Sequence, residues 1–232
     1  MKTVLVTGGV RGIGLAVCEG FLRKGYRVCA CYSKDELSAQ KAREKGIETF
    51  RADVSKEGDV QSLFKAIGNV DILINNAGVS LFKQIQDVTE EEVDALLSVN
   101  LKGAILCARE ASKGMIAKGA GLIVQISSVW GEVGGSCESV YSATKAALIG
   151  FTKALAKELG YSGVRVNCIS PGVVDTTMNA RLSAADMRSL VEDIPAGRVG
   201  VGEDVAQAAL YLDEATYVTG IDLPVNGGFS IV

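Results

Sequence analysis

Short apolar segments alternate with amphipathic segments along the whole chain, and this alternation limits the possible folds most strongly. Several apolar segments, such as Val4-Leu5-Val6, lack polar alternation, which is typical of strands buried on both faces of a parallel sheet. The predicted strands are Thr3–Thr7, Arg27–Cys31, Glu48–Ala52, Asp71–Asn75, Gly121–Ser127, Arg165–Ser170 and Ile221–Val225. The predicted helices are Gly12–Lys24, Asp35–Lys45, Lys56–Ala66, Glu90–Lys118, Ser139–Leu159 and Glu203–Leu212. This order predicts an α/β fold with a parallel sheet and helices on both faces.

The chain shows no linker, low-complexity tract or internal repeat, so residues 1–232 are predicted to form a single domain. The longest stretch without a predicted helix or strand is 171–195. Two interpretations stay open for this stretch. It is either an active-site lid or a surface excursion that holds one short helix.

The chain contains no histidine, which excludes Ser-His-Asp triads, Cys-His dyads and histidine metal ligands. Proton transfer near neutral pH must then use another side chain. The formal net charge is −3 and the basic residues form no block, which argues against nucleic acid or a membrane surface as partner. No apolar run is long enough for a signal peptide or a membrane span, and the six cysteines are scattered. We therefore expect a cytoplasmic protein with reduced thiols and no metal site.

A glycine-rich segment, Thr7-Gly8-Gly9-Val10-Arg11-Gly12-Ile13-Gly14, directly follows the first predicted strand and opens the first predicted helix. Glycines at positions 8 and 12 would let the backbone approach a pyrophosphate, and the one at position 14 would let the helix pack closely on the sheet. The free N–H groups of the helix N-terminus favour phosphate. A glycine-rich turn alone is weak evidence, but its place after the first strand predicts a dinucleotide site. The residues assigned to this site are Gly8, Arg11, Gly12, Ile13 and Gly14.

The end of the second predicted strand indicates which dinucleotide binds. An acidic residue there bonds the ribose 2′-hydroxyl of NAD, whereas basic residues accept the 2′-phosphate of NADP. Tyr32 stands near that acidic position, and Ser33 and Lys34 follow it. With Arg11 they would form a phosphate clamp, so we expect NADP(H) rather than NAD(H). The alternative is that Arg11 and Lys34 are solvated surface charges, and the nearby Asp35 makes the distinction less sharp.

Further motifs follow in order along the chain. They are Asp53-Val54, Asn75-Asn76-Ala77-Gly78, Asn100, Ser128, Tyr141-xxx-Lys145, Pro171-Gly172 and Val225-Asn226-Gly227-Gly228. Together they cover nearly the whole chain and resemble the short-chain dehydrogenase/reductase family, most of all its 3-oxoacyl-acyl carrier protein reductases. The resemblance implies a Rossmann-type, doubly wound, seven-stranded parallel sheet and an NAD(P)-dependent oxidoreductase acting on alcohol and carbonyl groups, with fatty acid biosynthesis as one possible context. It also implies a homotetramer, with two long helices at one interface and the tail Tyr217–Val232 at another.

The same resemblance implies that the cofactor lies along the carboxyl edge of the sheet, where ligands bind in open α/β folds. Asp53 and Val54 would flank the adenine. The residues implied for the adenosine ribose are Asn75, Ala77 and Gly78, and those for the nicotinamide are Pro171, Gly172, Val174 and Thr176. Turn chemistry alone would explain several of them, so the assignment depends on the whole set of motifs.

Tyr141 and Lys145 lie four residues apart in a predicted helix and therefore share one face. Ser128 lies 13 residues before Tyr141, and with Asn100 the four match the family's Asn-Ser-Tyr-Lys tetrad. The resemblance implies Tyr141 as proton donor in reduction, Ser128 as donor to the carbonyl oxygen, Lys145 as a ribose ligand and Asn100 as holder of a water. Because free tyrosine has a pKa of about 10, we expect the Lys145 ammonium to lower it. Ser127 is the rival of Ser128, which the spacing favours.

The substrate is less well indicated. Of the positions where acyl carrier reductases often have arginines, only Lys118 is basic here, which weakens the case for carrier docking. Trp130 would line the pocket or belong to the core. The run Gly135-Ser136-Cys137-Glu138 resembles one in bacterial reductases of the aminopentanone modification on elongation factor P, where Glu138 would attract an amine; the other interpretation is a solvated helix N-terminal acid.

We therefore predict an NADPH-dependent reductase of a 3-oxoacyl-type ketone, small or carrier-bound. Reduction of modified elongation factor P is the alternative, and a non-catalytic dinucleotide sensor is a remote one.

Overall fold

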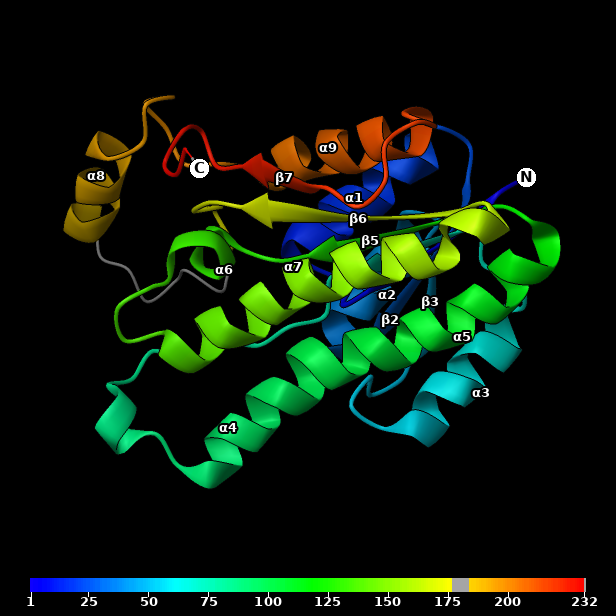
Figure 1. The fold of residues 1–232 in the computed structure, drawn as a ribbon, viewed down its shortest axis with the longest axis horizontal. Helices are drawn as coiled ribbons and strands as arrows, with labels where there is room; N and C mark the ends of the chain where they lie inside the picture. Colours follow the sequence, from blue (N-terminus) through cyan, green and yellow to red (C-terminus); the bar gives the residue numbers. More distant parts are fainter. Residues whose placement is uncertain (177–183, 232) are drawn as a thin grey trace.

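The computed structural model describes residues 1–176 and 184–231. Seven strands form one sheet in the order β3-β2-β1-β4-β5-β6-β7, and all neighbouring strands are parallel (Figure 1). The strands are β1 Thr3–Thr7, β2 Arg27–Tyr32, β3 Glu48–Arg51, β4 Ile72–Asn75, β5 Gly121–Ile126, β6 Val164–Pro171 and β7 Asp222–Val225. The order runs outward in both directions from the β1–β4 pair, so the predicted doubly wound, Rossmann-type fold is confirmed.

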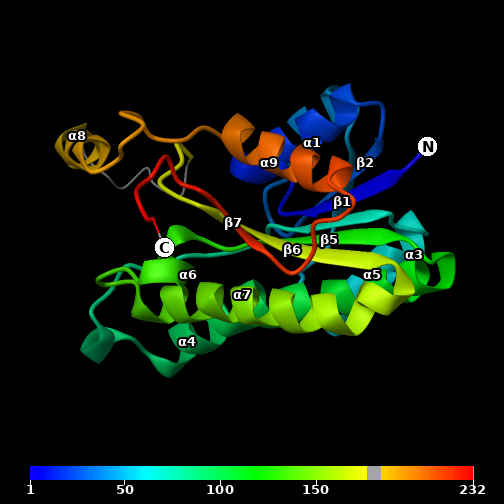
Figure 2. The same ribbon diagram turned by 45° about the horizontal axis from the view of Figure 1, so that its top comes forward.

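Helices cover both faces of the sheet (Figure 2). The described α-helices are α1 Gly12–Arg23, α2 Glu36–Glu44, α3 Glu57–Ile67, α4 Glu90–Leu96, α5 Gly103–Lys118, α6 Val129–Val133, α7 Ser139–Leu159, α8 Ala184–Glu192 and α9 Gly202–Glu214. Three short turns, η1 Ile85–Asp87, η2 Leu97–Lys102 and η3 Gly160–Ser162, complete them. The helices α1, α2 and α9 pack on one face, and α3, α5 and α7 pack on the other.

The core consists of two layers because successive strand residues point to opposite faces. In β1, Val4 and Val6 join the layer under α1 and α9, whereas Leu5 joins the layer under α5 and α7. All three side chains are fully buried. This explains why the strand is apolar at every position, as expected for a sheet covered on both sides.

The predicted single helix Glu90–Lys118 is wrong in one respect, because the π-helical turn η2 separates α4 from α5. Asn100 lies within this turn and is 1% exposed. Its side-chain oxygen accepts a hydrogen bond from the Val79 N–H at 2.8 Å, and its amide donates to the Val79 carbonyl at 2.9 Å. This π-helical turn, which is wider than an α-helical one, directs the Asn100 side chain toward the loop after β4. Such turns are frequent at functional sites.

The stretch 171–195 contains α8, which agrees with the interpretation of an excursion that holds one short helix. Before it, Val174 forms a β-bridge with Gly200. Residues 177–183 of this stretch and Val232 of the predicted tail interface lie outside the described residues. The lid interpretation stays a prediction. Among the helices that the structure describes, none is long and apolar enough to cross a membrane.

Candidate active site

The glycine-rich loop after β1 is tied to the loop after β4 by hydrogen bonds. The Thr7 hydroxyl oxygen accepts from the backbone N–H groups of Asn76 and Ala77, both at 2.9 Å. The Asn76 amide donates to the carbonyls of Thr7 at 2.9 Å and of Gly8 at 3.1 Å. Thr7 and Asn76 were not predicted as site residues. Their signal was their place at the carboxyl ends of two central parallel strands, since Thr7 ends β1 and Asn76 follows β4.

Close packing explains the glycines of this loop. A Cβ atom at Gly14 would lie 2.4 Å from the Gly8 carbonyl oxygen and 2.6 Å from the Asn76 side-chain nitrogen. Gly8 and Gly12 have φ of +63° and +53°, which other residues rarely adopt. A Cβ at Gly12 would be 3.5 Å from the Thr176 methyl group, so the loop after β6 lies against the glycine loop.

The first turn of α1 fits a phosphate group. Its N-cap residue, Arg11, makes no side-chain capping hydrogen bond, so no side chain of the cap occupies the N–H groups there. Gly12 and Gly14 contribute no side chains of their own to the same turn. A pyrophosphate would find N–H donors and the positive end of the helix dipole there.

Basic side chains gather at the end of β2. Arg11 is exposed and lies 3.6 Å from the Asp35 carboxylate. Lys34 is exposed, and the Arg51 guanidinium donates to the Ser33 carbonyl at 3.2 Å. Arg51 was not predicted, although its position at the end of β3, in register with Tyr32, is the signal for it.

Several predicted cofactor residues also have structural partners. The Tyr32 hydroxyl donates to Glu36 at 2.5 Å. The Asp53 carboxylate accepts from the Ser55 hydroxyl at 2.7 Å, and this bond holds the pKa of Asp53 below its usual value. Asn75 is buried, and its amide donates to the Ala104 carbonyl on α5 at 3.0 Å. Their side chains therefore fix the loops at this edge of the sheet.

The four predicted catalytic residues come together at this edge. Tyr141 is 8% exposed, and its hydroxyl lies close enough to Ser128, which caps α6, for that serine to act on its pKa. The Lys145 ammonium lies 5.6 Å from the centroid of the Tyr141 ring and donates to the Ile126 carbonyl at 2.8 Å. A Cβ at Gly78 would be 3.4 Å from the Asn100 side-chain oxygen and 3.6 Å from the Lys145 nitrogen. The loop after β4 thus meets both residues.

The structure separates the two neighbouring serines. The Ser127 hydroxyl donates to the Lys145 backbone carbonyl at 2.8 Å and is 3% exposed. It therefore fastens β5 to α7, while Ser128 is the serine that acts on the pKa of Tyr141. Thr144, which was not predicted, receives a bond from the Asn100 amide at 3.1 Å and donates to the Tyr141 carbonyl at 2.7 Å.

Comparison with known proteins agrees with this geometry. The pattern of the short chain dehydrogenase family matches residues 2–187. The chain belongs to the short chain dehydrogenase family. It is 40% identical to carbonyl reductase family member 4 of Xenopus laevis over 235 residues, 99% of this chain and 98% of the relative. It is 36% identical to the uncharacterized oxidoreductase YmfI of Bacillus subtilis (strain 168) over 238 residues, 98% of each.

A further relative is the 3-oxoacyl-[acyl-carrier-protein] reductase FabG of Staphylococcus aureus (strain N315), 35% identical over 239 residues, 98% of this chain and 97% of the relative. The chain is thus an oxidoreductase of a family that binds NAD(P)(H). The predicted resemblance is confirmed.

From the sequence, we expect Lys145 to lower the pKa of Tyr141. In this short chain dehydrogenase the pKa of Tyr141 is instead raised to about 12. Burial is the main cause, the hydrogen bond with Ser128 opposes it, and the charge of Glu138 adds to it. Burial also lowers the pKa of Lys145 to about 8. Loss of water around both groups outweighs their mutual attraction. A raised pKa keeps Tyr141 protonated at neutral pH, but it also makes the phenol a weaker acid than free tyrosine.

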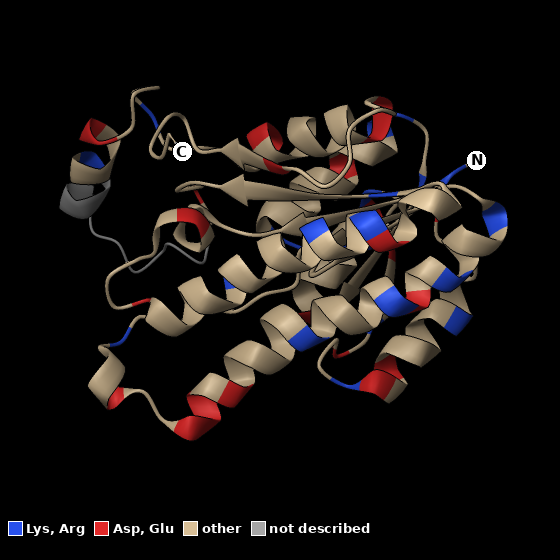
Figure 3. Cartoon of the chain, in the orientation of Figure 1, with Lys and Arg blue, Asp and Glu red and all other residues tan. Residues whose placement is uncertain are grey.

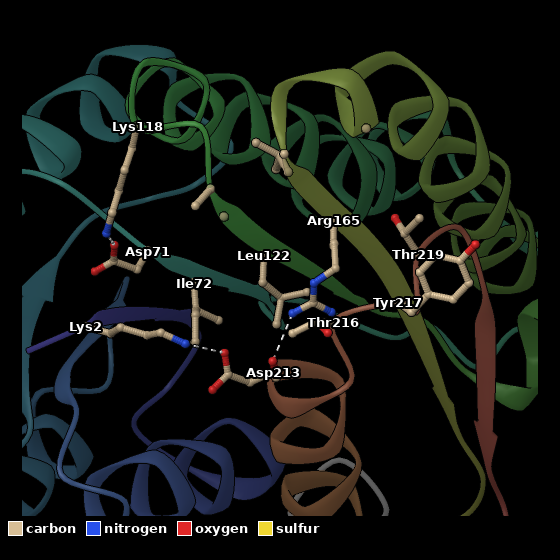
Figure 4. A pocket seen from close by; sticks show the side chains of 15 residues that line it. Lys2, Asp71, Ile72, Lys118, Leu122, Arg165, Asp213, Thr216, Tyr217 and Thr219 are labelled. Atoms are coloured by element: carbon tan, nitrogen blue, oxygen red, sulfur yellow. Dashed lines mark hydrogen bonds and ion pairs between the residues drawn. The ribbon is translucent and has the colours of Figure 1, made fainter.

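A cavity of about 680 Å³ lies at the opposite, amino edge of the sheet (Figure 4). Its charged groups pair with one another. Lys2 bonds Asp213 at 3.0 Å, Lys118 bonds Asp71, and Arg165 donates to four carbonyls at the end of α9. Arg165 therefore acts as a C-cap of this short chain dehydrogenase's last helix. None of the four predicted catalytic residues lines this cavity.

Proposed function

We propose that the chain is an NADPH-dependent reductase of 3-oxoacyl-type ketones, with Asn100, Ser128, Tyr141 and Lys145 as its catalytic residues. The observation that carries the proposal is the grouping of Ser128, Tyr141 and Lys145, with the Lys145 ammonium 5.6 Å from the centroid of the Tyr141 ring and Ser128 acting on the Tyr141 hydroxyl. This arrangement lies at the edge where the glycine loop opens. Ser128, Tyr141 and Lys145 provide a hydrogen-bond donor, a proton donor and a positive charge. These groups suit the reduction of a carbonyl through an alkoxide to an alcohol.

The bound nicotinamide supplies the hydride, which the protein itself cannot provide. Ser128 donates a hydrogen bond to the carbonyl oxygen, and that bond strengthens as negative charge develops there. Tyr141 then delivers its phenolic proton to the same oxygen. In the reverse direction the phenolate takes the proton back.

Lys145 has two parts in this proposal. Its ammonium compensates the charge left on Tyr141, and it binds the nicotinamide ribose hydroxyls. Asn100 holds a water that supplies Lys145 with a proton, which the closeness of both side chains to Gly78 supports. No imidazole is needed anywhere in the sequence of proton transfers.

The proposed cofactor ligands follow the edge of the sheet from the adenosine half to the nicotinamide. They are Gly8, Arg11, Gly12, Ile13, Gly14, Tyr32, Ser33, Lys34, Asp53, Val54, Asn75, Ala77, Gly78, Pro171, Gly172, Val174 and Thr176, together with Tyr141 and Lys145. The contacts of Thr176 with Gly12 and of Gly8 with Ala77 support a single continuous site.

We expect the double variant Arg11→Ala/Lys34→Ala to raise the KM for NADPH about 10- to 100-fold and to leave that for NADH within about threefold. Two charge-assisted bonds to the 2′-phosphate would be lost, and NADH has no such phosphate. Steady-state kinetics with both cofactors measure the effect. Lys157→Ala, which removes a charge at the amino edge, is the control. A parallel loss for NADPH and NADH would contradict the NADP preference.

The function is tested by mixing the protein with NADPH and an acetoacetyl ester and following nicotinamide absorbance. We expect NADPH to be consumed in proportion to the alcohol formed. Tight NADPH binding without turnover on any ketone of a broad panel would instead favour a non-catalytic dinucleotide sensor.

One observation favours the second candidate, reduction of the aminopentanone group on elongation factor P. Glu138 is 8% exposed, and its charge acts on Tyr141. A carboxylate this close to the catalytic tyrosine would attract a cationic amine. An amine-bearing ketone reduced far faster than the acetoacetyl ester would select this candidate.

We further propose a cytoplasmic homotetramer whose substrate is small or carrier-bound, without nucleic acid or membrane as partner. Exposed apolar side chains on α5, Ile105 and Ile116, support burial of that helix in an assembly. In the tail, Ile231 is 88% exposed and supports the second interface.

A further inference from the structure

Two carboxyl groups meet beside the catalytic serine. Glu132 lies on α6, four residues after Ser128, and Asp222 begins β7. The two carboxyl groups are hydrogen bonded to each other. In the described chain the second oxygen of Glu132, Oε2, is buried and has no hydrogen-bond partner. Two carboxylates this close repel unless one of them keeps a proton.

The neighbours of the pair decide which carboxyl keeps the proton. Both oxygens of Asp222 accept from the Ser170 hydroxyl, at 2.8 and 2.9 Å, so Asp222 is held as an acceptor. Burial and the charge of Asp222 raise the pKa of Glu132 to about 7, and the Ser230 hydroxyl opposes part of this increase. Glu132 is therefore the carboxyl that donates the shared proton.

The pair lies where α6 meets the C-terminal tail, and the two views of the fold both place the tail beside this helix (Figures 1 and 2). Trp130 of α6 packs edge-on against Phe229 of the tail, with ring centroids 5.5 Å apart. Ser128 caps α6 through its bond from the Trp130 N–H at 3.2 Å. The orientation of the Ser128 hydroxyl thus depends on how α6 is held.

We propose that Glu132 is a positioning residue: it shares one proton with Asp222 and thereby holds α6, and with it Ser128, against the last strand of the sheet. The effect on turnover rests on the proposed function, whereas the shared proton does not. Above the pH at which Glu132 loses this proton, both carboxyl groups are charged and α6 is pushed from β7.

Other titratable groups face the pair from the elements packed around it. On β6, burial raises the pKa of the Cys168 thiol. The charge of Asp222 also raises this pKa, and the charge of Lys145 lowers it. On α7, burial lowers the pKa of Lys145 to about 8 and raises that of Tyr141 to about 12, both above the pKa of Glu132. Figure 3 marks the acidic and basic residues along the ribbon and shows an acidic residue on α6.

The sign of the stability effect follows from the raised pKa. The native chain keeps the Glu132 proton between the ordinary value of 4.5 and about 7, where the unfolded chain does not. This group therefore stabilises the fold most at pH below about 4.5, and its contribution is lost as pH rises through about 7.

Glu132→Gln tests the proposal, because its amide keeps a donor to Asp222 at every pH. Thermal unfolding and kcat/KM for an acetoacetyl ester are measured between about pH 5.5 and about pH 7.5, below the transition of Lys145. We expect the wild-type Tm to fall by about 2–4 °C across this range relative to Glu132→Gln. The wild-type kcat/KM falls about threefold or more, and that of the variant changes less than about twofold.

Asp222→Asn provides a second variant with only one ionisable carboxyl, and it is expected to flatten both profiles as well. Glu44→Gln, the same change on the exposed surface of α2, is expected to keep the wild-type profiles. Wild-type slopes in both Glu132→Gln and Asp222→Asn would overturn the proposal. If no ketone is reduced, the proposed function fails, while the unfolding profiles still decide whether the proton is shared.

Discussion

Tyr141→Phe lowers kcat for ketone reduction by about 10²- to 10⁴-fold, because the variant has no proton to give to the alkoxide. NADPH affinity changes less than about threefold, since the ring, Lys145 and the glycine loop stay in place. Stopped-flow consumption of NADPH measures the chemical step, and fluorescence titration measures binding.

Tyr217→Phe is the matched control for this change. Tyr217 is fully exposed at the amino edge of the sheet, so the same loss of a hydroxyl is expected to leave kcat within about twofold. Turnover that persists in Tyr141→Phe would show that another group donates the proton, and the assignment of the tetrad would be wrong.

Gly14→Ala is expected to weaken NADPH binding by about 100-fold or more and to lower the Tm by several degrees. The added methyl group would lie 2.4 Å from the Gly8 carbonyl oxygen and 2.6 Å from the Asn76 nitrogen, so the loop must open. A few kcal/mol of strain at the phosphate-binding turn corresponds to about 100-fold in affinity.

Gly58→Ala is the control, because a Cβ atom there meets nothing within 4 Å. Gly58 lies in the first turn of α3, where alanine loses less backbone entropy than glycine, so this variant is expected to be at least as stable and to bind NADPH normally. Normal binding by Gly14→Ala would contradict the role of the glycine loop as the phosphate site.

The strands were predictable because a strand buried on both faces is apolar at successive positions, and such apolar runs can be read directly from the sequence. β1 has the predicted ends, and β2 and β5 each differ by one residue. The helix α7 also has the predicted ends, Ser139 and Leu159, because its period and its position after β5 agree. The shared edge of the sheet follows from strand parallelism alone.

Three features of the site could not be predicted from local pattern. A π-helical turn at Leu97–Lys102 leaves the apolar period almost unchanged, so Asn100 looks like part of one helix. The direction of the Tyr141 pKa depends on burial by elements distant in sequence. Glu132 and Asp222 lie 90 residues apart in the chain, and only the fold brings their carboxyl groups together.

The central claim is hydride transfer from NADPH to a ketone at the Tyr141 site, and isotope transfer tests it most directly. The protein is incubated with an acetoacetyl ester and deuterium-labelled NADPH. The label lies on the nicotinamide carbon that loses hydride, and the two faces of this carbon are labelled in separate experiments. Mass spectrometry of the alcohol is expected to show one deuterium on the carbinol carbon from one labelled face only, and Tyr141→Phe is expected to form this labelled alcohol about 10²- to 10⁴-fold more slowly. Alcohol without deuterium from either face, or NADPH that stays bound and unconsumed, would contradict the account.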